Sequence, residues 1–423
     1  MNKFKIKKLK NNLPVILAPI AGTETVTAII MFKTGSKYET RENNGMSHFL
    51  EHMFFKGTEK RPNTLQLSSE LDVLGGEFNA FTSKEYTAYY VKVAKEKLER
   101  GLELLSDMLQ NSKFDTAEIE REKGVIIEEY NMCEDNSQES VEDVLEELLY
   151  GDTPAGWQVL GTKENIRRFT REDFIKYFKS QYGANSAVLC LAGNIKDKEV
   201  LKLSYEYFGT LPENKFKNKI KTVEKQSAPA LKIKYKETDQ THLALGVRTF
   251  PLGHKDEQAA KMLSVILGGS MSSRLFIEVR ERRGLAYYVR TNTDFYTDSG
   301  YMATWAGVPL EKLDEAVKII LAEYKRLTEE LVSPRELKRT KEMLSGRLAM
   351  QLEASDDLAG WYVRQMTLRG NLITPKESLR KIMKVTAKDI QRVAKKIFSD
   401  NRLNLAIVGK IKDEKKIKEI LKF

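Results

Sequence analysis

The chain has 423 residues, a formal net charge of +10, 41% hydrophobic and 31% charged residues, a balance typical of a globular protein with two or three domains. Lysines and arginines are spread along the chain without an aromatic-studded strip or a recognition motif, so nucleic-acid binding is not expected. No apolar run reaches about 18 residues, which predicts no membrane span.

The first half of the chain predicts an α+β unit. Its basic N-terminus leads into a short, strand-like apolar segment at 14–18, without a signal-peptide core, so we expect a cytoplasmic protein. This segment is the first of two strands expected between 15 and 32, and the second is at 25–32. The later elements are a helix after the loop 35–45, a helix at 64–74, strands at 77–83 and 87–93, a helix at 95–109, a long helix capped by Asp115, helices at 140–150 and 170–178, and a strand at 186–192.

The same pattern returns after a Lys- and Asn-rich linker. Three segments match in order, at an offset between about 215 and 218 residues: 115–123 with 333–341, 169–174 with 385–390, and 189–195 with 405–411. We therefore predict an internal duplication, with an N-terminal half at 1–212, a linker at 213–229 and a C-terminal half at 230–423. The expected fold is two homologous α/β-sandwich halves, each a mixed, mostly antiparallel sheet with helices packed on one face.

Two of only four histidines stand in the segment His48-Phe-Leu-Glu51-His52. On a helix, positions i and i+4 share one face, so both imidazoles could reach a single Zn²⁺. Glu51 would lie close enough to take a proton from a metal-activated water, as in other H-x-x-E-H sequences. A lone histidine on an apolar helix face is more often a core residue, but this pair with its interposed acid favours a metal site.

A third ligand should come from another helix, and the acidic helix after Asp115 offers several candidates. Glu122 and Glu129 are seven residues apart and share a face, so one could ligate while the other orients a histidine. Spacing alone does not choose between them. In the second half the matching positions are Thr340 and Arg347, which cannot bind zinc, so only the first half is expected to hold a metal.

The H-x-x-E-H motif, the later Val-Ile-Ile-Glu-Glu segment and the duplicated α+β unit resemble the inverzincin peptidases, the family of pitrilysin, insulin-degrading enzyme and mitochondrial processing peptidase. The resemblance covers essentially the whole chain, and the length fits the short, processing-peptidase-like branch. It implies a zinc metalloendopeptidase with one Zn²⁺ per chain. It assigns His48, His52 and Glu129 as zinc ligands, Glu51 as general base, and Glu122 as the acid that supports a ligand.

The same resemblance implies substrate-binding residues. Residues 76–82 are similar to an edge strand with the pattern G-x-x-N-A-x-T, where an extended peptide adds as a further strand beside Asn79 and Ala80. Residues 273–287 are similar to a segment whose Arg280 and Tyr287 hold the scissile carbonyl and its oxyanion.

Two further assignments have plain structural alternatives. Phe55 matches an aromatic residue that lines the pocket after the cleaved bond, although a core role fits it nearly as well. Glu139 and Asp143 match an acidic pair that reads arginine, although a solvated pair is an equal alternative. The acidic stretch that holds them points to basic peptides among the substrates.

The resemblance implies an endopeptidase that hydrolyses unfolded peptides inside a chamber formed by two subunits. We expect a homodimer in which Arg280 and Tyr287 act at the zinc of the opposite subunit. A heterodimer with a paralogue is the alternative assembly. The alternative function is a non-catalytic or partner-dependent subunit of a heteromeric processing-peptidase-like complex. The intact ligand set and the Arg/Tyr element favour the self-sufficient enzyme.

Overall fold

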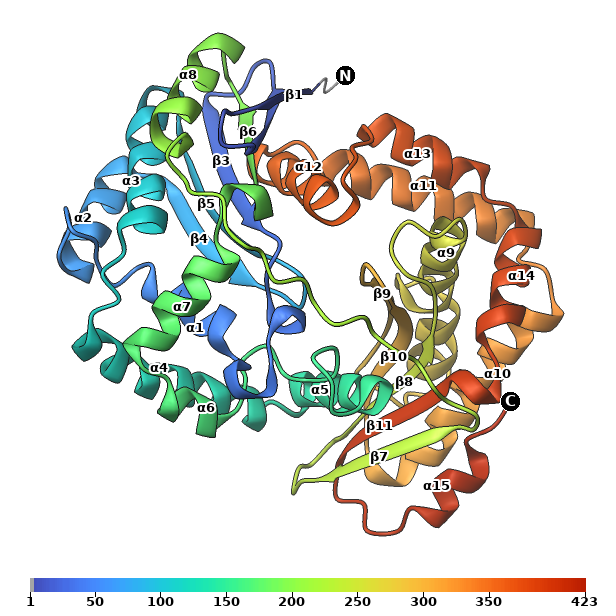
Figure 1. Ribbon diagram of the computed structural model, residues 1–423. Helices are drawn as coiled ribbons and strands as arrows, with labels where there is room; N and C mark the ends of the chain where they lie inside the picture. Colours follow the sequence, from blue (N-terminus) through green and yellow to red (C-terminus); the bar gives the residue numbers. More distant parts are fainter. Residues whose placement is uncertain (1–3) are drawn as a thin grey trace. The chain divides into compact units, whose positions relative to one another are not determined.

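The computed structural model describes residues 4–423 and divides into two compact units (Figure 1). Unit 1 contains the described residues up to Tyr130 together with Gln158–Ile220 and Arg347–Lys376. Unit 2 contains Asn131–Trp157, Lys221–Gly346 and Glu377–Phe423. Each unit therefore includes one segment from the other half of the sequence.

Unit 1 is built on a six-stranded sheet with the order β1-β2-β6-β3-β5-β4. Strands β2 and β6 run parallel and the other neighbours run antiparallel, so the sheet is mixed and mostly antiparallel, as predicted. Strand β4 forms one edge. The strands are β1 (Lys5–Lys8), β2 (Pro14–Pro19), β3 (Thr25–Phe32), β4 (Glu77–Thr82), β5 (Thr87–Ala94) and β6 (Ala187–Gly193).

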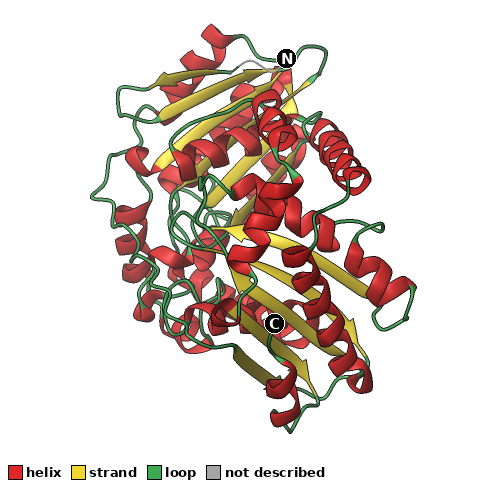
Figure 2. Cartoon of the chain, turned by 90° about the vertical axis from the view of Figure 1, so that its right-hand side faces the viewer, coloured by secondary structure: helices red, strands yellow, loops and turns green. Residues whose placement is uncertain are grey.

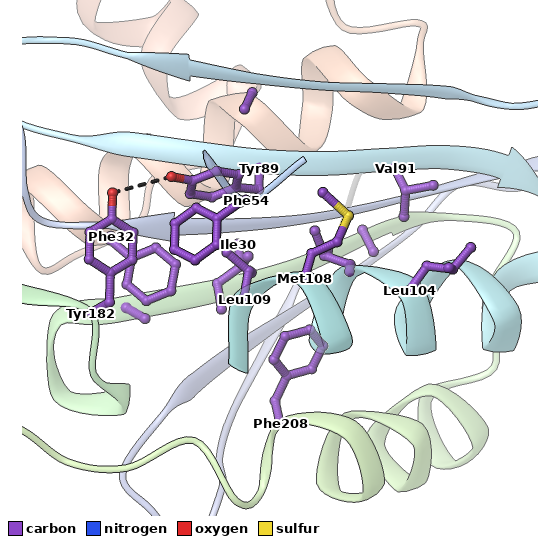
Figure 3. Close-up of a cluster of buried hydrophobic side chains, with 14 of the residues drawn as sticks. Ile30, Phe32, Phe54, Tyr89, Val91, Leu104, Met108, Leu109, Tyr182 and Phe208 are labelled. Atoms are coloured by element: carbon purple, nitrogen blue, oxygen red, sulfur yellow. Dashed lines mark hydrogen bonds between the residues drawn. The ribbon is translucent and has the colours of Figure 1, made fainter. Parts of the chain in front are cut away.

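Alternating side chains of β3 divide the core of unit 1 between the two faces of the sheet. Ile30 and Phe32 pack with the helices of the first half, while Ile29 and Met31 face the helix Ser355–Arg369 (α12) from the second half. Figure 3 shows the first of these clusters, where the Tyr89 and Tyr182 hydroxyls lie 3.2 Å apart. The helices of this unit are α1 (Met46–Met53), α2 (Thr64–Leu74), α3 (Leu98–Asn111), α6 (Lys163–Arg168), α7 (Arg171–Gln181), α8 (Asp197–Phe208) and α12 (Ser355–Arg369), and α4 (Thr116–Asp135) begins here.

Unit 2 repeats the plan with a five-stranded sheet in the order β7-β11-β8-β10-β9. Its strands are β7 (Ala230–Tyr235), β8 (Thr241–Arg248), β9 (Tyr288–Phe295), β10 (Gly300–Val308) and β11 (Leu403–Gly409). Its helices are α5 (Ser137–Tyr150), α9 (Glu257–Gly268), α10 (Leu313–Glu329), α14 (Ala387–Ile397) and α15 (Lys415–Ile420), together with most of α11 (Pro334–Gln351) and α13 (Pro375–Lys384). A π-helix spans Phe276–Glu281.

The predicted fold class is confirmed, and the structure adds an exchange of helices. In unit 1 the orange α12 lies along the blue strands, and in unit 2 α5 packs on β8 and β11 (Figure 1). Figure 2 shows the yellow strands of both sheets among red helices. The duplication extends to capping, because Thr170 with Asp173 and Thr386 with Asp389 form the same capping box 216 residues apart.

Several element boundaries differ from the predictions. Strand β1 was not predicted, because its sequence Lys-Ile-Lys-Lys is exposed throughout and has no apolar alternation. The helix predicted from 140 begins at Ser137, because the Asn136 side chain accepts the Gln138 N–H and caps it. The helix predicted from 95 opens with a 3₁₀ turn at Lys95–Lys97. Within residues 4–423, no helix is both long and apolar enough to cross a membrane.

The exchanged helix α12 predicts a stability test. Leu358 is 0% exposed in the cluster between α12 and the sheet of unit 1. Its truncation in Leu358→Ala should lower the free energy of unfolding by about 2–5 kcal/mol, because a cavity remains where the side chain was. Urea unfolding followed by circular dichroism measures this loss. The control Leu65→Ala, at a side chain 76% exposed on α2, should stay within about 0.5 kcal/mol of the wild type. Equal losses in both variants would contradict the buried role of α12.

Candidate metal centre

The short helix α1 carries the H-x-x-E-H segment, and its start is held by a buried carboxylate. Glu39 accepts the backbone N–H groups of Gly45 and Ser47 at 2.8 and 2.7 Å, and so satisfies donors at the free helix end. Burial raises the pKa of Glu39, against the opposing effect of these hydrogen bonds. Gly45 has a φ of 98° and a Cβ there would meet Leu160 O at 2.6 Å, so α1 begins at a position that only glycine fits.

The two histidines and one glutamate of α4 form a compact cluster. His48 Nε2 lies 3.5 Å from Glu129 Oε1, and His52 Nε2 lies 3.5 Å from Glu129 Oε2. The ligand atoms of the three residues are all within 4.8 Å of one another. The contact with His48 holds the pKa of Glu129 below its usual range, although burial acts to raise it.

This cluster fits a zinc ion by its distances and by its donor atoms. A tetrahedral ion with N and O ligands at about 2.0–2.2 Å separates neighbouring ligand atoms by about 3.3–3.6 Å. Both contacts between histidine nitrogens and Glu129 oxygens fall in this range. Two neutral imidazoles and one carboxylate are also a ligand set that catalytic zinc sites use, with a further position left for water or substrate.

Glu122 supports the cluster from the other side of His52. Its Oε1 accepts a hydrogen bond from His52 Nδ1 at 2.8 Å, and its Oε2 pairs with Lys56 Nζ at 2.6 Å. Although burial acts to raise the pKa of Glu122, these two contacts hold it below its usual range. A carboxylate on Nδ1 fixes the tautomer that leaves Nε2 free to ligate. The structure therefore distinguishes the two glutamates: Glu129 lies near the Nε2 atoms of both histidines, and Glu122 contacts Nδ1 of His52. Their spacing in the sequence did not make this distinction.

Glu51 lies beside the cluster without being part of it. Its Oε2 accepts a hydrogen bond from the Thr82 hydroxyl at 2.5 Å. Burial raises the pKa of Glu51, and the Thr82 hydrogen bond and both histidines act against that rise. A carboxylate with a raised pKa next to a metal site is suited to accept and return a proton.

Three residues of the predicted peptide-binding region lie in the same unit. Asn79 is exposed on the edge strand β4, which pairs with β5, and its side-chain oxygen accepts the Ala80 N–H at 2.9 Å. Phe55 packs partly buried against the core of unit 1, with its ring 6.4 Å from that of Phe78. Phe55, Phe78 and Asn79 line one small recess, and the partly buried position of Phe55 agrees with the core role that the sequence also allowed.

The remaining predicted residues belong to unit 2. Arg280 lies on the π-helix, with its guanidinium 5.4 Å from the Tyr287 ring centre, and Tyr287 is 77% exposed. Glu139 and Asp143 are one turn apart on α5. Glu139 is exposed and accepts the Asn136 side chain at 2.8 Å, so it also takes part in the cap of α5.

Sequence reasoning missed three supporting residues: Glu39, Lys56 and Thr82. Glu39 precedes α1 by a loop, and no motif reveals a capping carboxylate seven residues upstream of the helix. Lys56 lies four residues after His52, a helical spacing that could have suggested a shared acidic partner. Thr82 closes the edge-strand motif, but only the fold shows that it meets Glu51.

A histidine-histidine-glutamate cluster with the Glu51 carboxylate beside it, in one half of a duplicated α/β chain, is an arrangement typical of the metallopeptidase class of protein. Residues 15–163 match the family model described as insulinase (peptidase family M16), and residues 168–344 match the model of the peptidase M16 inactive domain. The chain belongs to peptidase family M16.

Relatives of similar length support this membership. The chain is 35% identical over 396 residues to the "Uncharacterized zinc protease YmxG" of Bacillus subtilis, covering 93% of this chain and 95% of the relative. It is 29% identical over 419 residues to the mitochondrial-processing peptidase subunit beta of Dictyostelium discoideum, covering 96% and 89%. A crystal structure of a protease from Helicobacter pylori has the same fold, with a TM-score of 0.90, 24% identity, and coverage of 97% of this chain and 100% of that one.

The position of Glu122 predicts its effect on metal affinity. Glu122→Gln keeps the shape of the side chain but removes the charge that faces His52 and Lys56, so zinc affinity should fall roughly 10- to 100-fold. Competition with a chromophoric chelator measures this change. The control is Glu120→Gln on the same helix, whose side chain is 61% exposed and paired with Lys123. Zinc affinity unchanged in Glu122→Gln would remove Glu122 from the metal centre.

Proposed function

We propose that the chain is a zinc-dependent endopeptidase that hydrolyses unfolded peptides, with Glu51 as general base. The observation that carries this proposal is the position of Glu51 beside the His48, His52 and Glu129 cluster, held by a hydrogen bond on one oxygen. Membership of peptidase family M16 and relatives named as zinc proteases support it.

In the proposed reaction His48, His52 and Glu129 hold one zinc ion per chain. The bound ion supplies Lewis acidity, which lowers the pKa of a water molecule and polarises a peptide carbonyl. Glu51 takes the proton from the attacking water, and its Oε1 is the oxygen that Thr82 does not contact. Glu51 then returns the proton to the nitrogen of the leaving amine, which completes hydrolysis without a covalent enzyme intermediate.

The edge strand β4 is the proposed docking site for the substrate. A strand at the edge of a sheet offers unpaired backbone groups, so a peptide can add to it whatever its side chains are. Asn79 and Ala80 lie on this strand, and Phe55 and Phe78 lie beside it as apolar neighbours for a substrate side chain. Backbone pairing of this kind requires an extended peptide, which excludes folded substrates.

We further propose that two copies of the chain enclose a chamber. Arg280 and Tyr287 would then stabilise the oxyanion at the metal centre of the opposite copy, and Glu139 with Asp143 would attract basic peptides. A relative named as the beta subunit of a mitochondrial-processing peptidase supports an assembly of more than one chain. The second candidate is a subunit that needs a different partner chain for activity.

The catalytic proposal is tested with the wild type and Glu51→Gln side by side. Both proteins should bind about one zinc per chain, because Glu51 is not a ligand. Hydrolysis of a quenched fluorescent basic peptide should fall about 100- to 10,000-fold in Glu51→Gln, because the reaction loses its base. If the wild type binds zinc but cleaves no peptide, the partner-dependent subunit is the better description. Full activity in Glu51→Gln would end the assignment of the base.

The shared site predicts complementation between two inactive chains. Glu51→Gln and Arg280→Ala chains, co-expressed with different tags and isolated as a mixed dimer, should recover about half of the wild-type activity, because one of the two composite sites contains no substitution. Each homodimer alone should stay nearly inactive. If Arg280 acts within its own chain, every site of the mixed dimer carries one defect and no activity returns.

A further inference from the structure

Thr82 occupies a position that joins substrate docking to the base. It is the last residue of the edge strand β4, and its hydroxyl donates to Glu51 Oε2. The hydroxyl donates its one hydrogen bond to this oxygen, so the contact fixes the orientation of the carboxylate and leaves Oε1 without a bond to Thr82. A strand that pairs with the substrate therefore also holds the group that acts on it.

The turn after Thr82 is closed by backbone contacts. The Ser83 N–H donates to Tyr86 O at 2.8 Å, and the Lys37 N–H donates to Lys84 O at 2.9 Å from the neighbouring loop. Gly35 of that loop packs so tightly that a Cβ would lie 2.1 Å from Ser83 O. The turn and the loop are thus fitted to each other at backbone level, which leaves Thr82 little freedom.

A buried ion triad fastens the same turn to a distant segment. Glu85 Oε1 lies 3.2 Å from Lys37 Nζ and 3.3 Å from Lys219 Nζ, and the three side chains are 2%, 1% and 9% exposed. Glu85 therefore ties the turn to two other segments, and loss of Lys219 would remove one of these ties while the Lys37–Glu85 pair stays balanced. Lys219 lies in the segment predicted as a linker, so this segment is anchored beside the turn that carries Thr82.

We propose that Thr82 is a positioning residue for Glu51, and that the Lys37–Glu85–Lys219 triad holds Thr82 in place through the β4–β5 turn. The inference rests on the proposed function, because it takes Glu51 as the base. It adds that the orientation of the base depends on the edge strand and on one lysine of the linker. Neither Thr82 nor Lys219 touches the substrate or the metal in this scheme.

Two substitutions of Thr82 test the first part. Thr82→Val removes the hydroxyl and keeps the branched shape, so kcat for a quenched peptide should fall roughly tenfold or more while KM and zinc content stay unchanged. Thr82→Ser restores the donor and should bring kcat back close to the wild type. An increase in KM without a fall in kcat would show a role in substrate binding and overturn the inference. Failure of Thr82→Ser to restore kcat would show a packing role and overturn it too.

The linker lysine tests the second part. Lys219→Met leaves the Lys37–Glu85 pair intact and should lower kcat several-fold, whereas Lys215→Met, at an exposed position of the same segment, should not. Amide hydrogen exchange in residues 83–86 should speed up in Lys219→Met alone, a readout that does not depend on catalysis. Unchanged exchange and unchanged kcat would remove the triad from the scheme.

A double-mutant cycle separates this inference from the proposed function. If the triad acts through Thr82, Lys219→Met should cost little further activity in a Thr82→Val background. If the fold-losses in kcat from Thr82→Val and Lys219→Met instead multiply in the double variant, the triad does not act through Thr82, and the second part of the inference is overturned. Loss of activity in Glu51→Gln with full activity in Thr82→Val would reject the positioning role while leaving the base in place. Full activity in Glu51→Gln would instead reject the proposed function itself.

Discussion

The contact between Glu122 and His52 is the constraint on which the metal centre depends. Glu122 is buried on α4 and meets His52 and Lys56 of α1, so the two helices can approach only where this carboxylate is satisfied. Two helical turns further along the same face, Glu129 then reaches both histidines. One buried hydrogen bond therefore sets the crossing point, and the seven-residue spacing places the third ligand.

The second half of the chain shows what the same architecture does without this constraint. At the position that matches Glu122, α11 has Thr340, which is buried and donates to the Glu336 carbonyl of its own helix at 2.9 Å. This hydroxyl needs no partner on a neighbouring helix, so α11 packs without a charged contact at that point. The second half therefore keeps the same architecture with Thr340 in place of Glu122, so the fold does not depend on that carboxylate.

The sequence predicted the duplication, the order of most elements and the H-x-x-E-H helix, because these depend on local periodicity, caps and repeated segments. It could not predict that α12 and α5 each cover a sheet built from the other half, because an apolar helix face shows that the helix packs against something but not against which sheet. Spacing placed Glu122 and Glu129 on one face but could not assign their contacts, which depend on the crossing of α1 and α4. Thr82 was missed because its contact with Glu51 is set by tertiary structure. Glu39 was missed because its contacts with Gly45 and Ser47 span an irregular loop that has no sequence signature.

Buried carboxylates surround α1 on several sides, and this distribution has a consequence for stability. Glu39 caps its start, Glu122 meets its last turn, and Glu85 lies in the turn that follows the strand facing Glu51. Buried ion pairs seldom stabilise a fold more than apolar residues of the same shape. Here these carboxylates fix the orientation of the groups around α1, because each carboxylate has one geometry in which its hydrogen-bond and ion-pair partners are satisfied. Unit 1 therefore gives up some stability so that the histidines, Glu129 and Glu51 hold a single arrangement.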